Sequence, residues 1–269
     1  RIRFHSEPDE GSWHAILKAL ALARGEYVCF MYVSDGYANK EWFATALHTL
    51  AEDPSLSLVW GIPDDMTEDG KLLGPHFAYA HFLGASHPGH KLRALKAVWD
   101  RFSWRNIKKV LLRKGSYQIS TLASMLRNGG ALQKEAWFSY WLKTGLAFPD
   151  ANMIVRKDVF EKCTPPYEPG SRIVDAFADF YFNFNSRGYL ARCLPVPANY
   201  GRIHAAQVTE KRQAEIQKMR RDYLRQIDNF KRELLLKKEM SFIDPLGHQV
   251  FSKALEHGEV CPSSGQGLR

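Results

Sequence analysis

Asp35 is the first residue whose type and position could support chemistry. It follows 27–33, an almost continuous apolar run rich in aromatic and β-branched residues, which predicts a strand buried on both faces. A carboxylate directly after such a strand projects from the C-terminal edge of a parallel sheet, where ligands bind. There it could hold Mg²⁺ or Mn²⁺ against a diphosphate. An Asp-Gly turn made by Asp35 and Gly36, which simply ends the strand, explains the pattern equally well.

Asp179 is the second candidate. It lies in 174–182, a segment rich in aromatic residues. Apolar surroundings can raise the pKa of a carboxyl group toward the range of a general base. A partly exposed aspartate on a helix is the alternative, and it is the commoner situation for this residue type.

Arg202 and His204 form the third candidate group. They end a short segment, 200–204, that follows a strand bounded by prolines. The guanidinium could clamp phosphate oxygens, and the imidazole could bind a metal ion or contact phosphate. A histidine without a partner nearby in the sequence is more often structural, so that alternative stays open.

Alternating helix and strand patterns surround these candidates. Apolar residues recur at helical spacing, and Gly25 stands where a C-terminal cap belongs. The predicted strands are 27–33, 56–60, 152–155 and 189–196, and the predicted helices are 12–24, 40–52, one starting at 157, and 173–187. This alternation predicts an α/β fold with a mostly parallel central sheet and flanking helices.

Two other segments lie between these elements. The acidic segment 64–70 resembles a calcium loop, but counting from Asp65 places His76 where the bidentate glutamate should be. An Asp-Gly hairpin turn is therefore the better interpretation. The histidine- and aromatic-rich segment 76–148 has no usable period, and we interpret it as a helical insertion that covers one end of the sheet.

Positive charge is concentrated near the C-terminus. The 269 residues include 37 Lys and Arg against 29 Asp and Glu, which gives a formal net charge of +8. Ten basic and five acidic residues lie within 211–240, around a single apolar stripe. We therefore divide the chain into an α/β domain at 1–205, a long basic amphipathic helix at 206–245, and a partly disordered tail at 246–269.

The basic helix has more than one interpretation. By default it packs its apolar stripe on the domain and exposes its charges to water. A functional alternative is peripheral attachment of 211–240 to an anionic membrane surface. Nucleic acid ranks low as a partner, because the segment has no interleaved exposed aromatics and no recognised reader motif.

Cysteine spacing and hydropathy exclude several classes of protein. The four cysteines lie far apart with no CxxC pair, which argues against a zinc ribbon and against a disulfide framework. No apolar run approaches the roughly 18–20 residues that cross a bilayer. We expect a cytoplasmic protein that can sit at the inner face of the membrane.

Three blocks of sequence resemble one enzyme family. Residues 6–11 read SEPDEG and 22–28 read LARGEYV, in register with the family pattern. Residues 31–35 read MYVSD at the position of its strand-end acidic motif. The third block comprises 148–160, Ala178-Asp179, Arg187-Gly188-Tyr189 and 200–204. Over about 1–75 and 148–210 the chain is thus similar to a family 2 glycosyltransferase with the A-type nucleotide-sugar fold.

The resemblance implies a role for each candidate. Asp179 would be the catalytic base and Asp35 the ligand of a divalent cation, Mn²⁺ or Mg²⁺. Arg202 would close over the diphosphate of the donor, and His204 would act there as a metal ligand. The donor-site positions that would orient the ribose or the base are Glu7 and Asp9. The resemblance also implies that the family's first strand, with its nucleobase loop, precedes Arg1.

These roles describe an inverting glycosyltransferase of polysaccharide biosynthesis. It would move a sugar from a nucleotide-sugar such as a UDP-sugar to a hydroxyl of a glycan or a lipid-linked saccharide. The alternative is a degenerate or truncated transferase that acts as a binding or scaffold protein. Tyr32 and Ser34 favour this alternative, because they replace polar or acidic positions of the family's motif.

Overall fold

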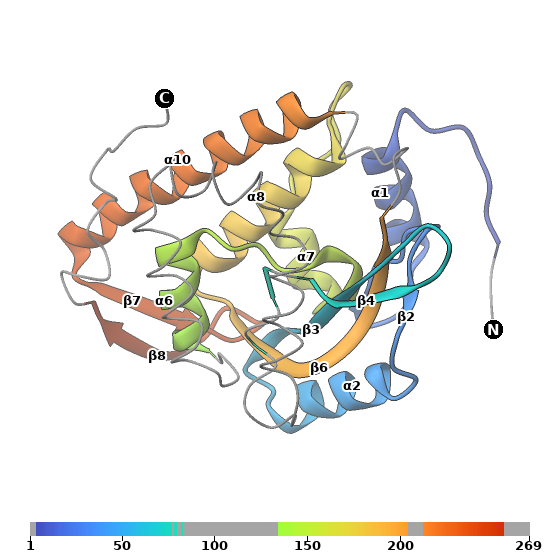
Figure 1. Cartoon of the computed structure of the whole chain (residues 1–269). Coiled ribbons are helices and arrows are strands. Elements are labelled where there is room, and N and C mark those ends of the chain that lie inside the picture. The colour runs from blue at the N-terminus through green and yellow to red at the C-terminus, as the bar shows by residue number, and fades with distance from the viewer. Residues whose placement is uncertain (1–3, 77, 80–81, 83–133, 204–211, 256–269) are drawn as a thin grey trace, which may run out of the picture.

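A mixed, curled β-sheet forms the centre of the protein in the computed structural model, which describes residues 4–76, 78–79, 82, 134–203 and 212–255 (Figure 1). The strand order is β1-β5-β3-β6-β2, and β4 pairs with the outer part of β3. The strands are β1 (Tyr27–Val28), β2 (Gly36–Tyr37), β3 (Leu56–Met66), β4 (Leu72–Pro75), β5 (Met153–Arg156) and β6 (Leu190–Arg202). The α/β class is confirmed.

The prediction of a mostly parallel sheet is wrong. The long strands β3 and β6 run parallel, from the pair Leu56–Leu190 to the pair Met66–Arg202. Among the described strands, every other pairing in this sheet is antiparallel. A short turn forces β4 to run antiparallel to β3, as expected for a hairpin. For the remaining strands, a run of apolar residues predicts that a strand is present. It does not predict whether the strand runs parallel or antiparallel to its neighbours.

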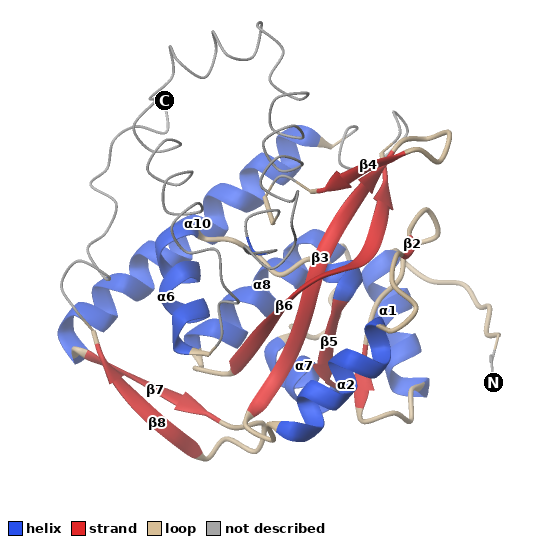
Figure 2. Ribbon diagram, turned by 60° about the horizontal axis from the view of Figure 1, so that its bottom comes forward, coloured by secondary structure: helices blue, strands red, loops and turns tan. Residues whose placement is uncertain are grey.

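Helices cover both faces of this sheet. Figure 2 shows α2 in front of the sheet, and α7 and α8 behind it. The helices are α1 (Ser12–Leu22), α2 (Trp42–Glu52), α6 (Glu135–Thr144), α7 (Lys157–Cys163), α8 (Ile173–Ser186) and α10 (Gln213–Lys237). Because both faces are covered, the first seven residues of β3, Leu56 to Ile62, are buried.

Aromatic rings make up much of the core. Trp60 of β3 lies edge-on to Trp137 of α6 and to Phe82, with ring centroids 5.3 and 5.0 Å apart. The Trp137 Nε1–H donates a hydrogen bond of 2.9 Å to the Asn185 side chain of α8. Helix α6 belongs to the predicted insertion, so the end of that insertion is a core element. The helical stretches predicted between 91 and 127 lie outside the described residues.

The prediction of a strand at 27–33 that is buried on both faces is wrong. Only β1, Tyr27–Val28, pairs with the sheet, at its edge beside β5. The chain then leaves the sheet with side chains alternating: Phe30 packs on the core, whereas Met31 and Val33 are exposed. The run is apolar for its whole length, but one of its faces meets solvent because it lies at an edge.

Helix α10 carries the predicted apolar stripe, and Tyr223, Ile227, Phe230 and Leu234 are buried on it. The Nε1–H of Trp141 donates a 2.7 Å hydrogen bond to the hydroxyl of Tyr223, which joins α10 to α6. The helix ends at Lys237, earlier than the predicted boundary at 245, and Lys238 adopts a left-handed conformation with φ of 58°. No helix in the described part of the chain is long and apolar enough to cross a membrane.

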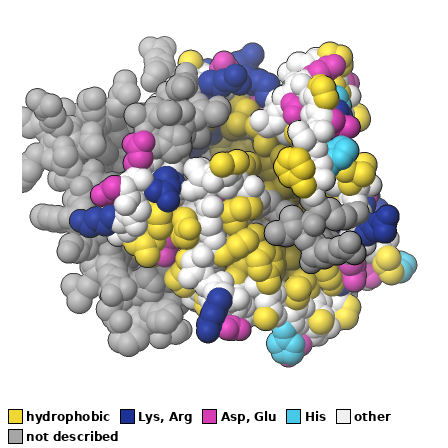
Figure 3. Space-filling view, turned by 90° about the vertical axis from the view of Figure 1, so that its right-hand side faces the viewer, with side chains coloured by type: hydrophobic (Ala, Val, Ile, Leu, Met, Phe, Trp, Pro, Cys, Tyr) yellow, Lys and Arg dark blue, Asp and Glu magenta, His cyan; other side chains and the backbone are white. Residues whose placement is uncertain are grey.

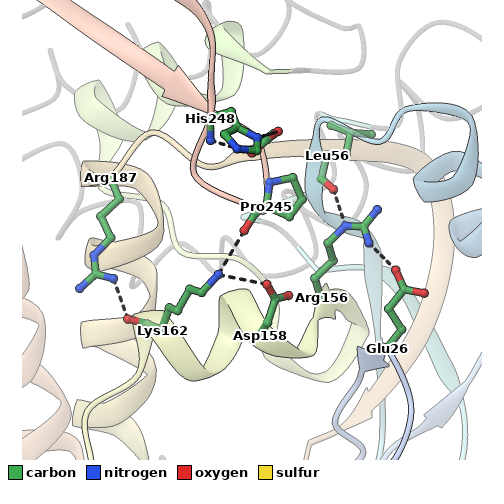
Figure 4. Close-up of polar contacts among 9 residues, drawn as sticks. Glu26, Leu56, Arg156, Asp158, Lys162, Arg187, Pro245 and His248 are labelled. Carbon is green, nitrogen blue, oxygen red and sulfur yellow. Dashed lines mark hydrogen bonds and ion pairs between the residues drawn. The ribbon is translucent and has the colours of Figure 1, made fainter.

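A hairpin follows α10, with its first strand inside the predicted helix at 206–245 and its second strand inside the predicted tail at 246–269. Strands β7 (Glu239–Ile243) and β8 (Gln249–Ala254) pair antiparallel. Lys162 of α7 holds the hairpin's turn, with Nζ 3.3 Å from the Pro245 carbonyl and 3.1 Å from Asp158 (Figure 4). Alternate residues of β7 are buried and the residues of β8 are exposed or partly exposed, so hydropathy gives little indication of this hairpin.

Candidate functional site

Asp35 lies beside the carboxyl ends of the two parallel strands. Strand β2 follows it directly and pairs antiparallel with the end of β6, with Gly36 opposite Tyr200. The backbone N–H of Arg202 donates a hydrogen bond to the Asp35 carboxylate. The Ser34 hydroxyl lies 3.3 Å from the Asp35 Oδ1. Asp35 therefore lies at the predicted edge, where the parallel strands end. It precedes an antiparallel strand, however, and does not follow a parallel one.

Asp150 is a second carboxylate at this place, and it was not among the predicted site residues. It begins a short 3-10 helix, Asp150–Asn152, that leads into β5. The Tyr32 hydroxyl donates a 2.7 Å hydrogen bond to the Asp150 Oδ2, and the Ala151 N–H donates one of 2.9 Å to Oδ1. Two segments far apart in the sequence thus meet through these contacts. In the sequence, Asp150 could have been noticed as the end of a Phe-Pro-Asp motif that comes just before a predicted strand.

Burial and mutual repulsion perturb both carboxyl groups. Burial raises the pKa of Asp35 above its usual range. Burial also raises the pKa of Asp150, and the nearby Asp35 charge adds to that rise. The Tyr32 phenol, close to both carboxylates, has its pKa raised by burial and then by Asp150. Carboxylates with raised pKa values near one another favour a proton or a cation between them.

Asn152 fixes the segment that carries Asp150. Its buried side-chain Nδ2 donates to the Gly61 carbonyl of β3 at 2.8 Å and to the Asn199 Oδ1 of β6 at 3.0 Å. One amide therefore ties the start of β5 to both parallel strands. This positions Asp150 on the rigid centre of the sheet.

Asp64 and Asp65 add acidic side chains at the end of β3. They lie opposite Tyr200 and Gly201 of β6 in the parallel register. Burial, followed by the charge of Asp65, raises the pKa of Asp64 to about 6. Within the described residues, the buried Asp64 Oδ1 has no hydrogen-bond partner. The predicted hairpin turn after these residues is confirmed, since β3 and β4 pair around 67–71.

Arg202 contributes its backbone and its side chain in different directions. While its N–H contacts Asp35, its guanidinium Nη1 donates to the Glu68 carbonyl in the β3–β4 turn at 2.5 Å. The structure thus brings together Asp35 and Arg202, two of the predicted site residues. His204 lies outside the described residues.

Asp179 lies on the side of α8 that contacts α10. Gln226 of α10 hydrogen-bonds to its carboxylate, and burial followed by the charge of Asp175 raises its pKa. Tyr181 lies on the opposite side of α8, and its pKa is raised by burial and then by the charge of Asp150. Among the contacts of the described residues, none joins Asp179 to Asp35 or to Asp150.

Glu7 and Asp9 make contacts within the N-terminal segment. Glu7 pairs with Lys18 of α1 at 3.0 Å and with His5 at 3.2 Å, and these partners lower its pKa. The Asp9 Oδ1 accepts the Gly11 N–H at 2.8 Å, just before α1 begins. Both residues therefore organise the approach to α1.

The molecular face that includes β2 and the β3–β4 turn is mixed in character. Figure 3 shows hydrophobic side chains gathered across its middle and charged side chains around them. Met31 and Val33, shortly before Asp35 in the chain, are exposed apolar residues.

The carboxylate oxygens suit a hard divalent cation. Mg²⁺ in particular is held by one or two carboxylates together with waters and substrate phosphates. Within the described residues, no group of three or more His, Cys, Asp or Glu side chains is arranged to hold a metal ion.

No protein-family model matches this sequence, and no curated protein matches it either. The residues and their geometry are therefore the basis for assigning a function.

Proposed function

We propose that the protein is an inverting glycosyltransferase with the A-type nucleotide-sugar fold. It would transfer a sugar from a nucleoside-diphosphate sugar, such as a UDP-sugar, to a hydroxyl of a glycan or a lipid-linked saccharide, and the nucleoside diphosphate would leave. The contact between Asp35 and the backbone of Arg202 carries this proposal. The resemblance assigns both residues to the same diphosphate, and they are neighbours although the rest of the domain separates them in sequence.

Asp35 would hold the donor's divalent cation, Mn²⁺ or Mg²⁺, on its carboxylate. When bound, such a cation neutralises charge on the departing diphosphate. The Arg202 guanidinium donates a hydrogen bond to the Glu68 carbonyl in the β3–β4 turn. It would release that carbonyl to clamp a phosphate oxygen. His204 remains a proposed ligand from the same segment.

Two carboxylates compete for the role of the base. The resemblance implies Asp179, whereas the geometry favours Asp150. Asp150 is close enough to Asp35 for their charges to interact, and its pKa is raised. The Tyr32 O–H at Oδ2 and the Ala151 N–H at Oδ1 fix its orientation. We assign to Asp150 the step in which a carboxylate accepts the proton of the attacking hydroxyl.

This assignment predicts how activity depends on pH. A base must be ionised, so the rate should rise with pH through the raised pKa of Asp150. The Tyr32→Phe variant removes a hydrogen bond that stabilises the ionised carboxylate. Its pH profile should therefore shift to higher pH, which is measured by the rate of UDP release across a pH series.

The test compares matched variants in an assay of UDP release from UDP-sugars with Mn²⁺. Asp35→Asn and Asp150→Asn should each lower the rate by about a hundredfold or more, the range for lost charge stabilisation or a lost base. Asp179→Asn should lower it less than about tenfold. Glu52→Gln, an exposed change on α2, is the control and should leave the rate unchanged. Full activity of Asp150→Asn with loss in Asp179→Asn would return the base to Asp179.

A binding or scaffold protein is the second candidate function. Tyr32 favours it, because this side chain is already bonded to Asp150 at the start of the acidic motif. Calorimetric titration with a UDP-sugar and Mn²⁺ distinguishes the two. Metal-dependent binding without any UDP release by the wild-type chain would support the scaffold.

A further inference from the structure

The outward face of α10 is a row of positive charge. Tyr223, Ile227, Phe230 and Leu234 mark the buried side of the helix. Lys218, Arg221, Arg225 and Arg232 are exposed. Since each residue turns the helix by about 100°, Arg221 and Arg225 lie roughly opposite Tyr223. Figure 1 shows α10 along the outer edge of the molecule, with α8 on its inner side.

Spacing places these four cations in one line. They are separated by three, four and seven residues, the intervals that return to the same helix face. At 1.5 Å per residue, the line is about 21 Å long. We name Lys218, Arg221, Arg225 and Arg232 the α10 cation row.

Of the four acidic residues of α10, Glu233 is exposed beside Arg232, and no ion pair among the described residues joins it to the row; the other three are paired as follows. Glu215 pairs inward with Arg172 at the start of α8, at 2.9 Å. Asp228 pairs with the buried Lys231 at 3.0 Å. Asp222 pairs with Arg225 at 3.2 Å, in an exposed contact that water screens. Within the described part of the chain, no acidic side chain pairs with the other three members of the row.

We propose that the α10 cation row is a docking surface for an anionic lipid bilayer, on which the helix lies parallel to the membrane plane. A straight row of long basic side chains is complementary to a flat array of phosphate and carboxylate headgroups. Leu236, one turn beyond Arg232, is 85% exposed on the same face and can enter the headgroup layer.

The same features argue against nucleic acid as the occupant. Proteins that hold single strands combine positive charge with aromatic side chains on which bases stack. Leu236, the exposed large hydrophobic residue of α10, is aliphatic, and the aromatic residues Tyr223 and Phe230 are buried. The row therefore offers charge and an aliphatic anchor, which suit a bilayer.

The test is co-sedimentation of the full chain with phosphatidylcholine vesicles, with and without phosphatidylserine. Each basic residue near an anionic surface contributes about fivefold in affinity. The double variant Arg221→Gln/Arg225→Gln should therefore bind serine-containing vesicles about 25-fold more weakly. Lys40→Gln/Lys71→Gln removes equal charge from exposed positions outside α10 and should bind like wild type. Binding of wild type should require phosphatidylserine and weaken as salt rises.

Three results would overturn the proposal. The first is vesicle binding that does not depend on phosphatidylserine, and the second is an equal loss of vesicle binding in both double variants. The third is a protein that binds no vesicles but binds polyuridine tightly, with this binding weakened by Arg221→Gln/Arg225→Gln. The last would make the row a nucleic-acid site. Circular dichroism and thermal unfolding check that the variants fold, as expected for exposed substitutions.

Discussion

Replacing Asp64 with asparagine should stabilise the protein at neutral pH and not in acid. The native state raises the pKa of this carboxyl from 3.8 to about 6, mainly through burial. The folded protein therefore binds the proton more tightly than the unfolded chain does. Below pH 3.8 both states are protonated and the carboxyl costs nothing. The cost grows between pH 3.8 and about 6, and it is complete above that range.

The size of the effect follows from the pKa difference. A shift from 3.8 to about 6 corresponds to roughly 3 kcal/mol at full strength. Asp64 is only partly buried, so solvent screening reduces this to about 1–2 kcal/mol. An amide is neutral at every pH and resembles the protonated acid in shape. The gain for Asp64→Asn should thus be about 1–2 kcal/mol near pH 7.5 and fall to about a fifth of that near pH 4.

Urea unfolding of wild type and Asp64→Asn at these two pH values measures the gain. Thermal unfolding at neutral pH should show Tm rising by about 2–4 °C per kcal/mol. Asp69→Asn in the neighbouring exposed turn is the control, because Thr67 lowers the pKa of Asp69 and no gain is expected there. An equal gain at both pH values, or a loss at neutral pH, would refute the reasoning from desolvation.

Two further predictions concern the packing of the C-terminal elements on the domain. Tyr223→Phe leaves the buried Trp141 Nε1–H without its acceptor and should cost about 1–3 kcal/mol in urea unfolding; an unchanged midpoint would show that water replaces the hydroxyl. Gly188→Ala should lower the Tm much more than Gly247→Ala. Both glycines have positive φ, but a Cβ at 188 would lie 2.2 Å from the Ser241 carbonyl, whereas one at 247 meets open space. Equal losses in the two variants would mean that backbone strain alone decides.

Local patterns were sufficient where neighbours in the sequence determine structure. The turn Asp69-Gly70 predicted the β3–β4 hairpin, and the spacing of apolar residues predicted α8 and the stripe of α10. These features depend on turn chemistry and helical periodicity within one segment. The direction of the strands depends on long connections, and here the prediction of a mostly parallel sheet was wrong.

The candidate site was predicted only in part because its contacts are non-local. Asp35 and Arg202 could be selected from strand ends and the family resemblance, and the structure places them in contact. Asp150 accepts a hydrogen bond from Tyr32, far away in the sequence. No window of sequence contains both residues. Asp179 likewise takes a hydrogen-bond partner, Gln226 of α10, from another element.

The two interpretations of Asp35, an Asp-Gly turn or a ligand at a strand edge, are compatible in the folded protein. Asp35 does end a turn, because its N–H bonds to the Tyr32 carbonyl at 3.0 Å. Gly36 then lets β2 approach β6 closely, since a Cβ there would lie 2.2 Å from the Tyr200 hydroxyl. That approach carries Asp35 to the end of β6, beside Gly201, where no side chain intervenes. The glycine that suggested an ordinary turn is thus what places the carboxylate at the parallel edge.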